Sequence, residues 1–320
     1  MQERRVGRSG LTVSRLGLGT MSFGAAIDQI DAEELLRGFV DAGGTLVDTA
    51  PVYGDGRCEE LVGGLLSKLG LRDRLVLAGK AGIARRGETV VRDSSRRSLL
   101  DQLDQSLRDL GTDHLDLWQV HRWDDDTPVE ETLAALEHAV ATGRTRYVGI
   151  SNFSGWQTAL AHTWLAGRPS ATPLVSTQVE YSLLHREPEA EVLPAARHTG
   201  MGVLAWSPLG RGVLTGKYRG GIPVDSRGAD PQWEAFVAPY LTRERTGVVE
   251  AVARAAEGLE VSMAQVALAW LRERPAVSCL VVGARTSHQL AEILASEDVT
   301  IPSEIVAALD DVSAPTTWEA

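Results

Sequence analysis

The sequence predicts a single domain with the fold of an eight-stranded parallel (β/α)8 barrel, or TIM barrel. Short apolar runs alternate with stretches of helical period along the 320 residues, which is the pattern of repeated β–α units. Most runs are continuously apolar, as expected for parallel strands that are buried on both faces. Eight such units suit the length of one α/β barrel, and no linker or change of composition divides residues 1–320.

The apolar runs are the predicted barrel strands. They are Leu16–Gly19, Leu46–Asp48, Leu75–Gly79, Leu115–His121, Tyr147–Ser151, Val175–Val179, Gly202–Trp206 and Ser278–Gly283. Two further segments do not fit the repeat. Arg5–Ser14 is predicted to form a hairpin of two short strands before the first barrel strand. Ser207–Tyr240, after the seventh strand, is rich in Gly, Pro and Arg and lacks a strand or helix period, as expected for a functional loop.

The amphipathic stretches between the strands are predicted helices. They are Asp31–Asp41, Glu59–Lys68, Ser94–Asp109, Pro128–Ala141, Ser154–Leu165, Pro188–His198, Thr242–Gly258, Ser262–Arg272 and Ser287–Leu294. Asp31 and Ser262 are candidate N-caps, because their side chains can accept hydrogen bonds from free backbone N–H groups. Glycines are predicted to end six of the helices. These glycines are Gly43, Gly70, Gly111, Gly143, Gly167 and Gly200.

The composition excludes several classes of function. The formal net charge is −11 and the pI is near 5.2, which argues against binding to nucleic acid or to an anionic membrane. No apolar run approaches the ~20 residues that span a bilayer, and the N-terminus lacks the apolar core of a signal peptide. Two distant cysteines, Cys58 and Cys279, cannot form a disulfide framework. We therefore expect a cytoplasmic protein with free thiols, and its oligomeric state stays open.

Four polar residues at or near predicted strand ends mark a candidate catalytic site. Asp48, Lys80 and His121 close the second, third and fourth strands, and Tyr53 lies in the loop after Asp48. The C-terminal ends of parallel barrel strands share one rim, so these side chains are expected to converge on one cavity. An isolated Asp–Lys pair or a single histidine is more often structural, but the ordered set of four favours catalysis.

The later strand ends carry groups that suit a nucleotide cofactor. The hydroxyl and amides of Ser151, Asn152 and Gln178 can hold a carboxamide, and the indole of Trp206 can stack on a flat heterocycle. Arg285 lies just before a helix N-terminus, whose free N–H groups favour a phosphate. These residues predict a long pocket for a nucleotide that ends in an aromatic amide.

Several motifs run through the chain in a fixed order. They are Gly17–Thr20 followed by Met21-Ser22-Phe23-Gly24, Val47-Asp48-Thr49-Ala50 with Tyr53-Gly54, Gly149-Ile150-Ser151-Asn152-Phe153, and Trp206-Ser207-Pro208-Leu209-Gly210-Arg211-Gly212 through Gly216-Lys217-Tyr218. Together they resemble the aldo-keto reductase family over nearly the whole chain. The resemblance is strongest to the branch with bacterial reductases and potassium-channel β subunits. It implies reduction of an aldehyde or ketone by NADPH, without a metal.

The resemblance implies a role for each of the four strand-end residues. Tyr53 would protonate the carbonyl oxygen as hydride arrives, and the cation of Lys80 would lower the pKa of its phenol. Asp48 would pair with Lys80 and hold it in place. His121 would donate a hydrogen bond that orients the carbonyl of a small-molecule substrate.

The resemblance also implies where NADP(H) would bind. Ser151, Asn152 and Gln178 would hold the nicotinamide amide, with Trp206 stacked on the ring and the loop after the seventh strand covering the cofactor. Arg285 would contact the 2′-phosphate, which favours NADPH over NADH. The other implied cofactor contacts are Thr20, Met21, Ser207, Leu209, Arg211, Lys217, Gly283, Gln289 and Glu292. The chain departs from the family at Ile293, where relatives often have an asparagine that contacts adenine.

Alternative interpretations stay open. A nucleotide-deoxysugar keto- or enoyl-reductase is a narrower version of the same activity. A regulatory barrel of the channel-β type would bind NADPH as a sensor, although His121 argues against it. A lyase with Lys80 as a Schiff base would leave Tyr53, Trp206 and Arg285 without a shared purpose.

Other residues could belong to the site or merely to its loops. Arg211 and Arg227 are weaker candidates, because arginines in mobile loops are usually solvated. Five aromatic residues either line the substrate mouth or pack loops. They are Phe23, Trp123, Trp233, Phe236 and Tyr240.

Overall fold

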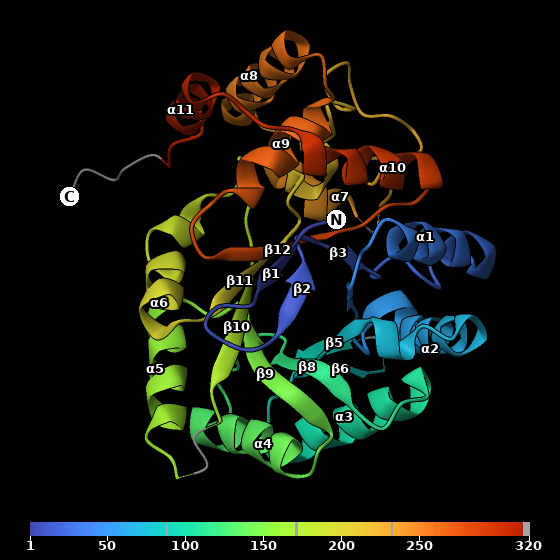
Figure 1. The fold of residues 1–320 in the computed structure, drawn as a ribbon, viewed down its shortest axis with the longest axis vertical. Coiled ribbons are helices and arrows are strands. Elements are labelled where there is room, and N and C mark those ends of the chain that lie inside the picture. The colour runs from blue at the N-terminus through green and yellow to red at the C-terminus, as the bar shows by residue number, and fades with distance from the viewer. Residues whose placement is uncertain (88, 170–171, 232, 316–320) are drawn as a thin grey trace.

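The structure is a computed structural model that describes residues 1–87, 89–169, 172–231 and 233–315. Within these residues, eight parallel strands form a closed barrel surrounded by helices (Figure 1). The barrel strands are β3 (Leu16–Gly19), β4 (Leu46–Asp48), β5 (Val76–Ala81), β8 (Leu115–Val120), β9 (Thr145–Ser151), β10 (Leu174–Glu180), β11 (Gly202–Trp206) and β12 (Val277–Val282). They pair in chain order, and β12 pairs with β3 to close the ring. The predicted (β/α)8 fold is therefore confirmed.

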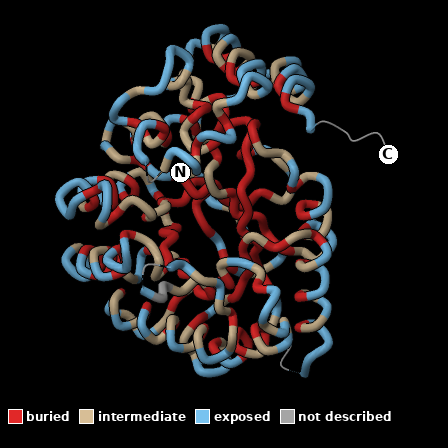
Figure 2. Tube along the Cα trace, turned by 180° about the vertical axis from the view of Figure 1, so that it is seen from behind, coloured by how far each residue is buried: buried red, intermediate tan, exposed pale blue. Residues whose placement is uncertain are grey.

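The helices surround the barrel and turn their buried faces toward the strands (Figure 2). They are α1 (Gln29–Asp41), α2 (Cys58–Leu69), α3 (Arg96–Leu110), α4 (Val129–Ala141), α5 (Gly155–Ala166), α6 (Val192–Thr199), α8 (Arg243–Leu259), α9 (Met263–Arg272), α10 (Ser287–Ala295) and α11 (Ser303–Val312). All but α11 correspond to a predicted helix, with small shifts at the ends. None of the described helices combines the length and the apolar character needed to cross a membrane.

The ends of the helices agree with most of the predicted caps. The N-cap of α1 is Asp28 and not Asp31, because the helix begins before Asp31 and the Asp28 carboxylate accepts from the N–H groups of Ile30 and Asp31. Ser262 caps α9 as predicted and forms a capping box with Gln265. Gly70, Gly111 and Gly200 are left-handed C-caps, Gly167 is a right-handed one, and Gly43 and Gly143 directly follow the C-caps of α1 and α4.

The N-terminal hairpin closes one end of the barrel. It consists of β1 (Glu3–Arg5) and β2 (Thr12–Ser14). The predicted hairpin is therefore confirmed, although its first strand starts before Arg5. Its apolar residues in the barrel interior are Val6, Leu11 and Val13. The turn requires Gly7, which has a φ of 59°, because a Cβ at this position would lie 2.2 Å from the Gly200 carbonyl oxygen. Because this end is filled, the opposite rim is left for a site.

Some elements of the structure are absent from the sequence prediction. A hairpin of β6 (Ile83–Arg86) and β7 (Thr89–Arg92) follows β5, and the segment Ser207–Tyr240 contains short helical turns where none is expected. These turns are η4 (Gly210–Thr215), α7 (Glu234–Val237) and η5 (Ala238–Tyr240). They are too short to produce a helical period, and η4 is interrupted by two left-handed residues, Arg211 and Gly212.

A buried acid lies between α2 and α3. The two helices approach closely, since a Cβ on Gly63 would lie 2.5 Å from the Asp109 carbonyl oxygen. One turn earlier, Glu59 is 1 % exposed, and neither carboxylate oxygen has a hydrogen-bond partner among the described residues. The Ser106 hydroxyl is near enough to stabilise the carboxylate, although its geometry falls short of a hydrogen bond. Burial, aided by Asp109, raises the pKa of Glu59 to about 7.

Glu59 should make the protein less stable as pH rises. Its pKa in the fold lies above its ordinary value of 4.5, so the stability gained from its proton is present below 4.5 and is lost as pH rises through about 7. Glu59→Gln should therefore reduce the fall in unfolding free energy between pH 5 and pH 8, by on the order of 3 kcal/mol. Urea unfolding at both pH values measures this. The exposed neighbour provides a control, Glu60→Gln, and equal pH dependence in both variants would contradict a raised pKa at Glu59.

Candidate active site

The polar residues at the open rim of the barrel form one connected group. The Lys80 ammonium, at the end of β5, donates to the carboxylate of Asp48 on the neighbouring strand β4. It also donates to the Thr49 carbonyl oxygen at 3.2 Å and to the Tyr53 hydroxyl at 3.3 Å. The second oxygen of Asp48 accepts from the Gln178 amide at 2.8 Å. The structure thus brings Asp48, Tyr53 and Lys80 together, as predicted from the positions of Asp48 and Lys80 at strand ends and of Tyr53 in the loop after Asp48.

Asp48 and Lys80 form a buried ion pair. Their residues are 2 % and 1 % exposed, respectively. Burial alone would lower the pKa of Lys80, but the negative charge of Asp48 and the contact with Tyr53 outweigh it and raise this pKa above its ordinary value. Lys80 is therefore a fixed positive charge directly behind the Tyr53 hydroxyl.

The pKa of the Tyr53 phenol is shifted in the opposite direction to the sequence-based expectation. Burial raises the pKa of Tyr53; Lys80 opposes this shift, but Asp48 adds to it. The expected downward effect of Lys80 is present, yet in the protein alone it does not overcome burial. The phenol is thus protonated at neutral pH. It is held in a tight turn, η1 (Tyr53–Gly56), where a Cβ on Gly54 would lie 2.4 Å from the Phe23 carbonyl oxygen.

His121 is a neutral imidazole beside the phenol. Its ring meets the Tyr53 ring edge to face, with 5.9 Å between centroids. Burial, together with the charges of Lys80 and Arg122, lowers the pKa of His121 to about 3. The backbone of His121 is fixed on both sides, because its N–H donates to Ala81 and its carbonyl accepts from the Asn152 amide at 3.0 Å. At neutral pH, His121 therefore offers one N–H donor and one acceptor.

The residues expected to hold a nicotinamide also lie together. The Asn152 amide donates to the Ser151 hydroxyl, its oxygen accepts from the Trp206 indole, and each distance is 3.0 Å. The Ser151 hydroxyl in turn donates to the Gln178 carbonyl oxygen at 2.9 Å. Gln178 links this group to Asp48, so both halves of the site share one hydrogen-bond network. Asn152 has a left-handed φ of 56°, which turns its amide toward these partners.

Three cations gather further along the rim. Burial lowers the pKa of Lys217, and the charges of Arg285 and Arg227 lower it further. Burial and Arg285 likewise lower the pKa of Arg227, whose guanidinium donates to the Ser22 hydroxyl at 3.0 Å. The backbone N–H of Arg285 donates to the Gln289 side chain at 2.9 Å. This cationic cluster, Lys217, Arg227 and Arg285, is suited to phosphate groups.

Arg211 lies outside this cluster. Its guanidinium donates to both carboxylate oxygens of Glu180, at 2.8 and 2.6 Å, and also to the Phe236 carbonyl. It lies 3.9 Å from the centroid of the Phe236 ring, and the Tyr240 hydroxyl donates to Glu180 at 3.0 Å. Arg211, Phe236 and Tyr240 therefore brace the loop after β11.

The remaining predicted residues vary in their surroundings. Thr20 is buried and its hydroxyl donates to the Asp48 carbonyl oxygen at 3.0 Å. Ile293 is buried in the core, so it packs α10 against the barrel. Met21, Ser207, Leu209 and Glu292 are half-buried, and Gly283 is exposed. Phe23 is buried, Trp233 lies against Arg227, and Trp123 packs edge to face on Phe153.

Other features near the rim lack a sequence motif. Arg122 acts on His121 through its charge, and its position directly after that histidine is the only sequence signal.

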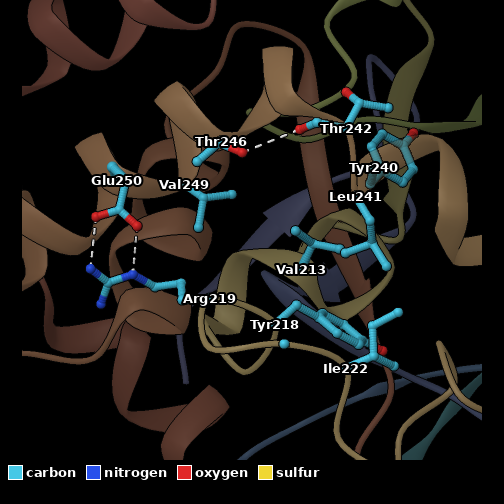
Figure 3. A pocket seen from close by; sticks show the side chains of 11 residues that line it. Val213, Tyr218, Arg219, Ile222, Tyr240, Leu241, Thr242, Thr246, Val249 and Glu250 are labelled. Carbon is cyan, nitrogen blue, oxygen red and sulfur yellow. Dashed lines mark hydrogen bonds and ion pairs between the residues drawn. The ribbon is translucent and has the colours of Figure 1, made fainter.

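A cavity of about 250 Å³ lies between the β11 loop and α8, lined by residues such as Tyr218, Ile222 and Glu250 (Figure 3). None of the four catalytic candidates lines this cavity. Among the described residues, no group of three or more His, Cys, Asp or Glu side chains could hold a metal.

Comparison with known proteins agrees with the barrel fold. A model of the aldo/keto reductase family matches residues 15–314. A probable voltage-gated potassium channel subunit beta of Oryza sativa subsp. japonica is 36% identical, over 98% of this chain and 96% of that protein. The uncharacterized oxidoreductase YrpG of Bacillus subtilis is 35% identical over 98% and 96% of the two chains. An L-glyceraldehyde 3-phosphate reductase of Escherichia coli O157:H7 is 35% identical over 97% and 92%.

A family match of this extent, with relatives above 30% identity over nearly the full chain, leaves one assignment. The chain belongs to the aldo/keto reductase family, which includes oxidoreductases and generally uses NAD(P)H.

Proposed function

We propose that the protein reduces an aldehyde or ketone to an alcohol with NADPH, and that Tyr53 supplies the proton. The observation that carries this proposal is the 3.3 Å contact between the Tyr53 hydroxyl and the Lys80 ammonium, which Asp48 holds in place. A phenol beside a permanently charged lysine can lose a proton to a neighbouring oxygen, because the cation stabilises the phenolate that remains.

The four catalytic candidates would have different roles at the substrate carbonyl. Bound NADPH would supply the hydride to the carbonyl carbon. Tyr53 would deliver its proton to the carbonyl oxygen, and Lys80 would offset the negative charge left on the phenolate. His121, kept neutral by burial, would donate an N–H to the same oxygen and so fix the direction of attack. Solvent would later restore the proton to Tyr53.

The cofactor would lie along the rim from the amide-binding residues to the cationic cluster. Ser151, Asn152 and Gln178 would hold the carboxamide, with Trp206 stacked on the nicotinamide ring. Lys217, Arg227 and Arg285 would share the pyrophosphate and the 2′-phosphate. The other residues proposed to line the cofactor are Thr20, Met21, Ser207, Leu209, Gly283, Gln289 and Glu292. Arg211 would support the same loop through Glu180 rather than touch a phosphate directly.

One other interpretation has support outside the catalytic group. Relatives named as potassium channel subunits are as similar as those named as oxidoreductases, which keeps a regulatory role for the barrel as the second candidate. A nucleotide-linked sugar substrate is a narrower form of the main proposal. We also propose that residues 1–320 act as one domain and that the protein is cytoplasmic, since Cys58 and Cys279 are both free and buried thiols.

Tyr53→Phe should lower turnover by roughly 10²–10⁴, because it removes the proton donor and leaves the ring. Lys80→Met should cause a comparable loss, and the double variant should cost little more, since the two residues act as a unit. His121→Ala should also impair turnover by releasing the carbonyl. Steady-state NADPH oxidation with an accepted aldehyde, alongside cofactor affinity, measures these effects. Tyr147→Phe, near the hairpin end of the barrel, is the matched control, and near-normal turnover in Tyr53→Phe would refute the proposed acid.

NADPH should bind more tightly than NADH, because the cationic cluster can use the extra phosphate. Arg285→Ala should remove most of the difference, since one charge-assisted contact contributes roughly 1.5–3 kcal/mol, or about tenfold to a hundredfold in affinity. Fluorescence titration with both cofactors tests this, with Arg197→Ala on the exposed side of α6 as the control. Equal affinities in the unmodified protein would rule out the preference.

Cofactor binding should quench the fluorescence of Trp206, because its indole would lie against the nicotinamide. The chain has eight tryptophans, so the quench identifies Trp206 only if Trp206→Ala abolishes it. The same variant should weaken NADPH binding and keep the fold, as measured by circular dichroism. Trp156→Ala, which removes a largely exposed indole, should leave the quench intact. A quench that survives in Trp206→Ala would place the ring elsewhere.

A further inference from the structure

We propose that the substrate mouth selects carbonyl compounds that carry an anionic group, a carboxylate or a phosphate, and that Arg92 and Arg122 hold that group. The inference rests on the proposed carbonyl reduction and names the substrate class of the same site. It starts from two arginines that come from different elements and lie together beside His121.

Backbone contacts bring the two arginines together. Arg122 directly follows His121 at the end of β8, and Arg92 ends β7, in the hairpin that follows the neighbouring strand β5. Two residues after Arg92, the Ser94 N–H donates to the Asp124 carboxylate, and the Ser94 carbonyl accepts from the Thr132 hydroxyl, both at 2.9 Å. The hairpin end is thereby fastened to the loop that carries Arg122. Arg92 and Arg122 are both exposed residues, and the backbone that carries them lies at the rim that holds His121.

The charges of the two arginines act on one another and on the imidazole. Burial lowers the pKa of the Arg122 guanidinium, and the charge of Arg92 lowers it further. Arg122 in turn contributes, after burial and Lys80, to the low pKa of His121. Among the residues that the structure describes, neither arginine side chain has an ion-pair or hydrogen-bond partner. Among the described residues neither guanidinium is engaged by a carboxylate, so both are available to an anion from solution, in a chain whose net charge is −11.

Among the described residues, no carboxylate of the neighbouring acidic run Asp124–Asp126 forms an ion pair with either arginine. Asp124 is buried and accepts from the N–H groups of Ser94 and Asp126 and from the Thr127 hydroxyl, at 2.9, 3.1 and 2.7 Å. Burial opposes its ionisation, but these bonds and the nearby charge of Arg92 hold the pKa of Asp124 below its ordinary value. Asp125 accepts from the Trp123 indole at 2.8 Å. The carboxylates of Asp124 and Asp125 therefore stabilise their own loop.

The chemistry of the mouth favours an anion over a neutral or cationic substituent. Asp48 is neutralised by Lys80, and His121 is uncharged, so the reacting end of the site presents no free negative charge. A guanidinium presents parallel N–H groups that match two oxygens of a carboxylate or phosphate. With its carbonyl at Tyr53 and His121, a substrate would place its anionic group toward Arg122 and Arg92. Electrostatic attraction would also speed its entry against the overall negative charge of the protein.

Matched substrate pairs test the proposal. The first pair is 4-formylbenzoate and its neutral isostere 4-formylbenzamide, and the second is glyceraldehyde 3-phosphate and glyceraldehyde. With NADPH, the unmodified protein should favour the anionic member of at least one pair by about tenfold or more in kcat/KM, mainly through KM. Arg122→Gln and Arg92→Gln should each reduce that ratio, whereas Arg197→Gln on α6 should not. A preference in only one of the two pairs would show whether the site binds a carboxylate or a phosphate.

Failure of the proposed anion site can be distinguished from failure of the proposed carbonyl reduction. A ratio near one in the unmodified protein, or a ratio that both variants leave unchanged, overturns the anion site while reduction itself stands. If no aldehyde is reduced, calorimetric titration with the unreactive dianion terephthalate, against neutral terephthalamide, gives the answer without turnover. Binding of terephthalate that Arg122→Gln weakens supports the site. No binding of terephthalate to the unmodified protein, with or without NADPH, overturns it.

Discussion

The burial of one ammonium ion governs the arrangement of the barrel rim. Lys80 is 1 % exposed, and taking a charge out of water costs several kcal/mol unless a partner compensates for it. β4 supplies Asp48 as that partner, and β10 supplies the Gln178 amide that satisfies the second oxygen of Asp48. A one-residue shift of either strand would turn these side chains to the other face and leave a buried charge unpaired. Strand register and the electrostatics of the site are therefore linked.

The strand β10 connects the two halves of the rim. Gln178 and Glu180 are two residues apart and so point to the same face of the strand. Gln178 reaches Asp48, whereas Glu180 binds Arg211 with two hydrogen bonds and accepts from Tyr240. The reacting group and the long loop after β11 are thus anchored to the same short piece of backbone. The N-terminal hairpin fills the opposite end of the barrel, which leaves this rim as the polar end.

Much of the architecture could be predicted because buried parallel strands and amphipathic helices leave strong periodic signals. β3, β4 and β11 coincide with their predicted bounds, and the strand-end residues Asp48 and Lys80 lie in contact, with His121 beside Tyr53. The β6–β7 hairpin could not be predicted in this way, because its strands are short and its pattern is interrupted by arginines. Arg227 was hard to identify, since its position beside Lys217 and Arg285 depends on how an irregular loop folds. The pKa of Tyr53 depends on burial, which a motif does not reveal.

The backbone around the rim has a consequence for how the protein could evolve or be engineered. Six non-glycine residues in the described part of the chain have positive φ, and four of them, Asp55, Asn152, Ser207 and Arg211, surround the rim. Such conformations cost of order 1–3 kcal/mol each and persist only where the surrounding structure enforces them. Glycine would relieve this strain, but it would remove the amide that orients Trp206 or the guanidinium that anchors the loop. The rim therefore stores conformational strain, and selection for thermostability alone would tend to erode it.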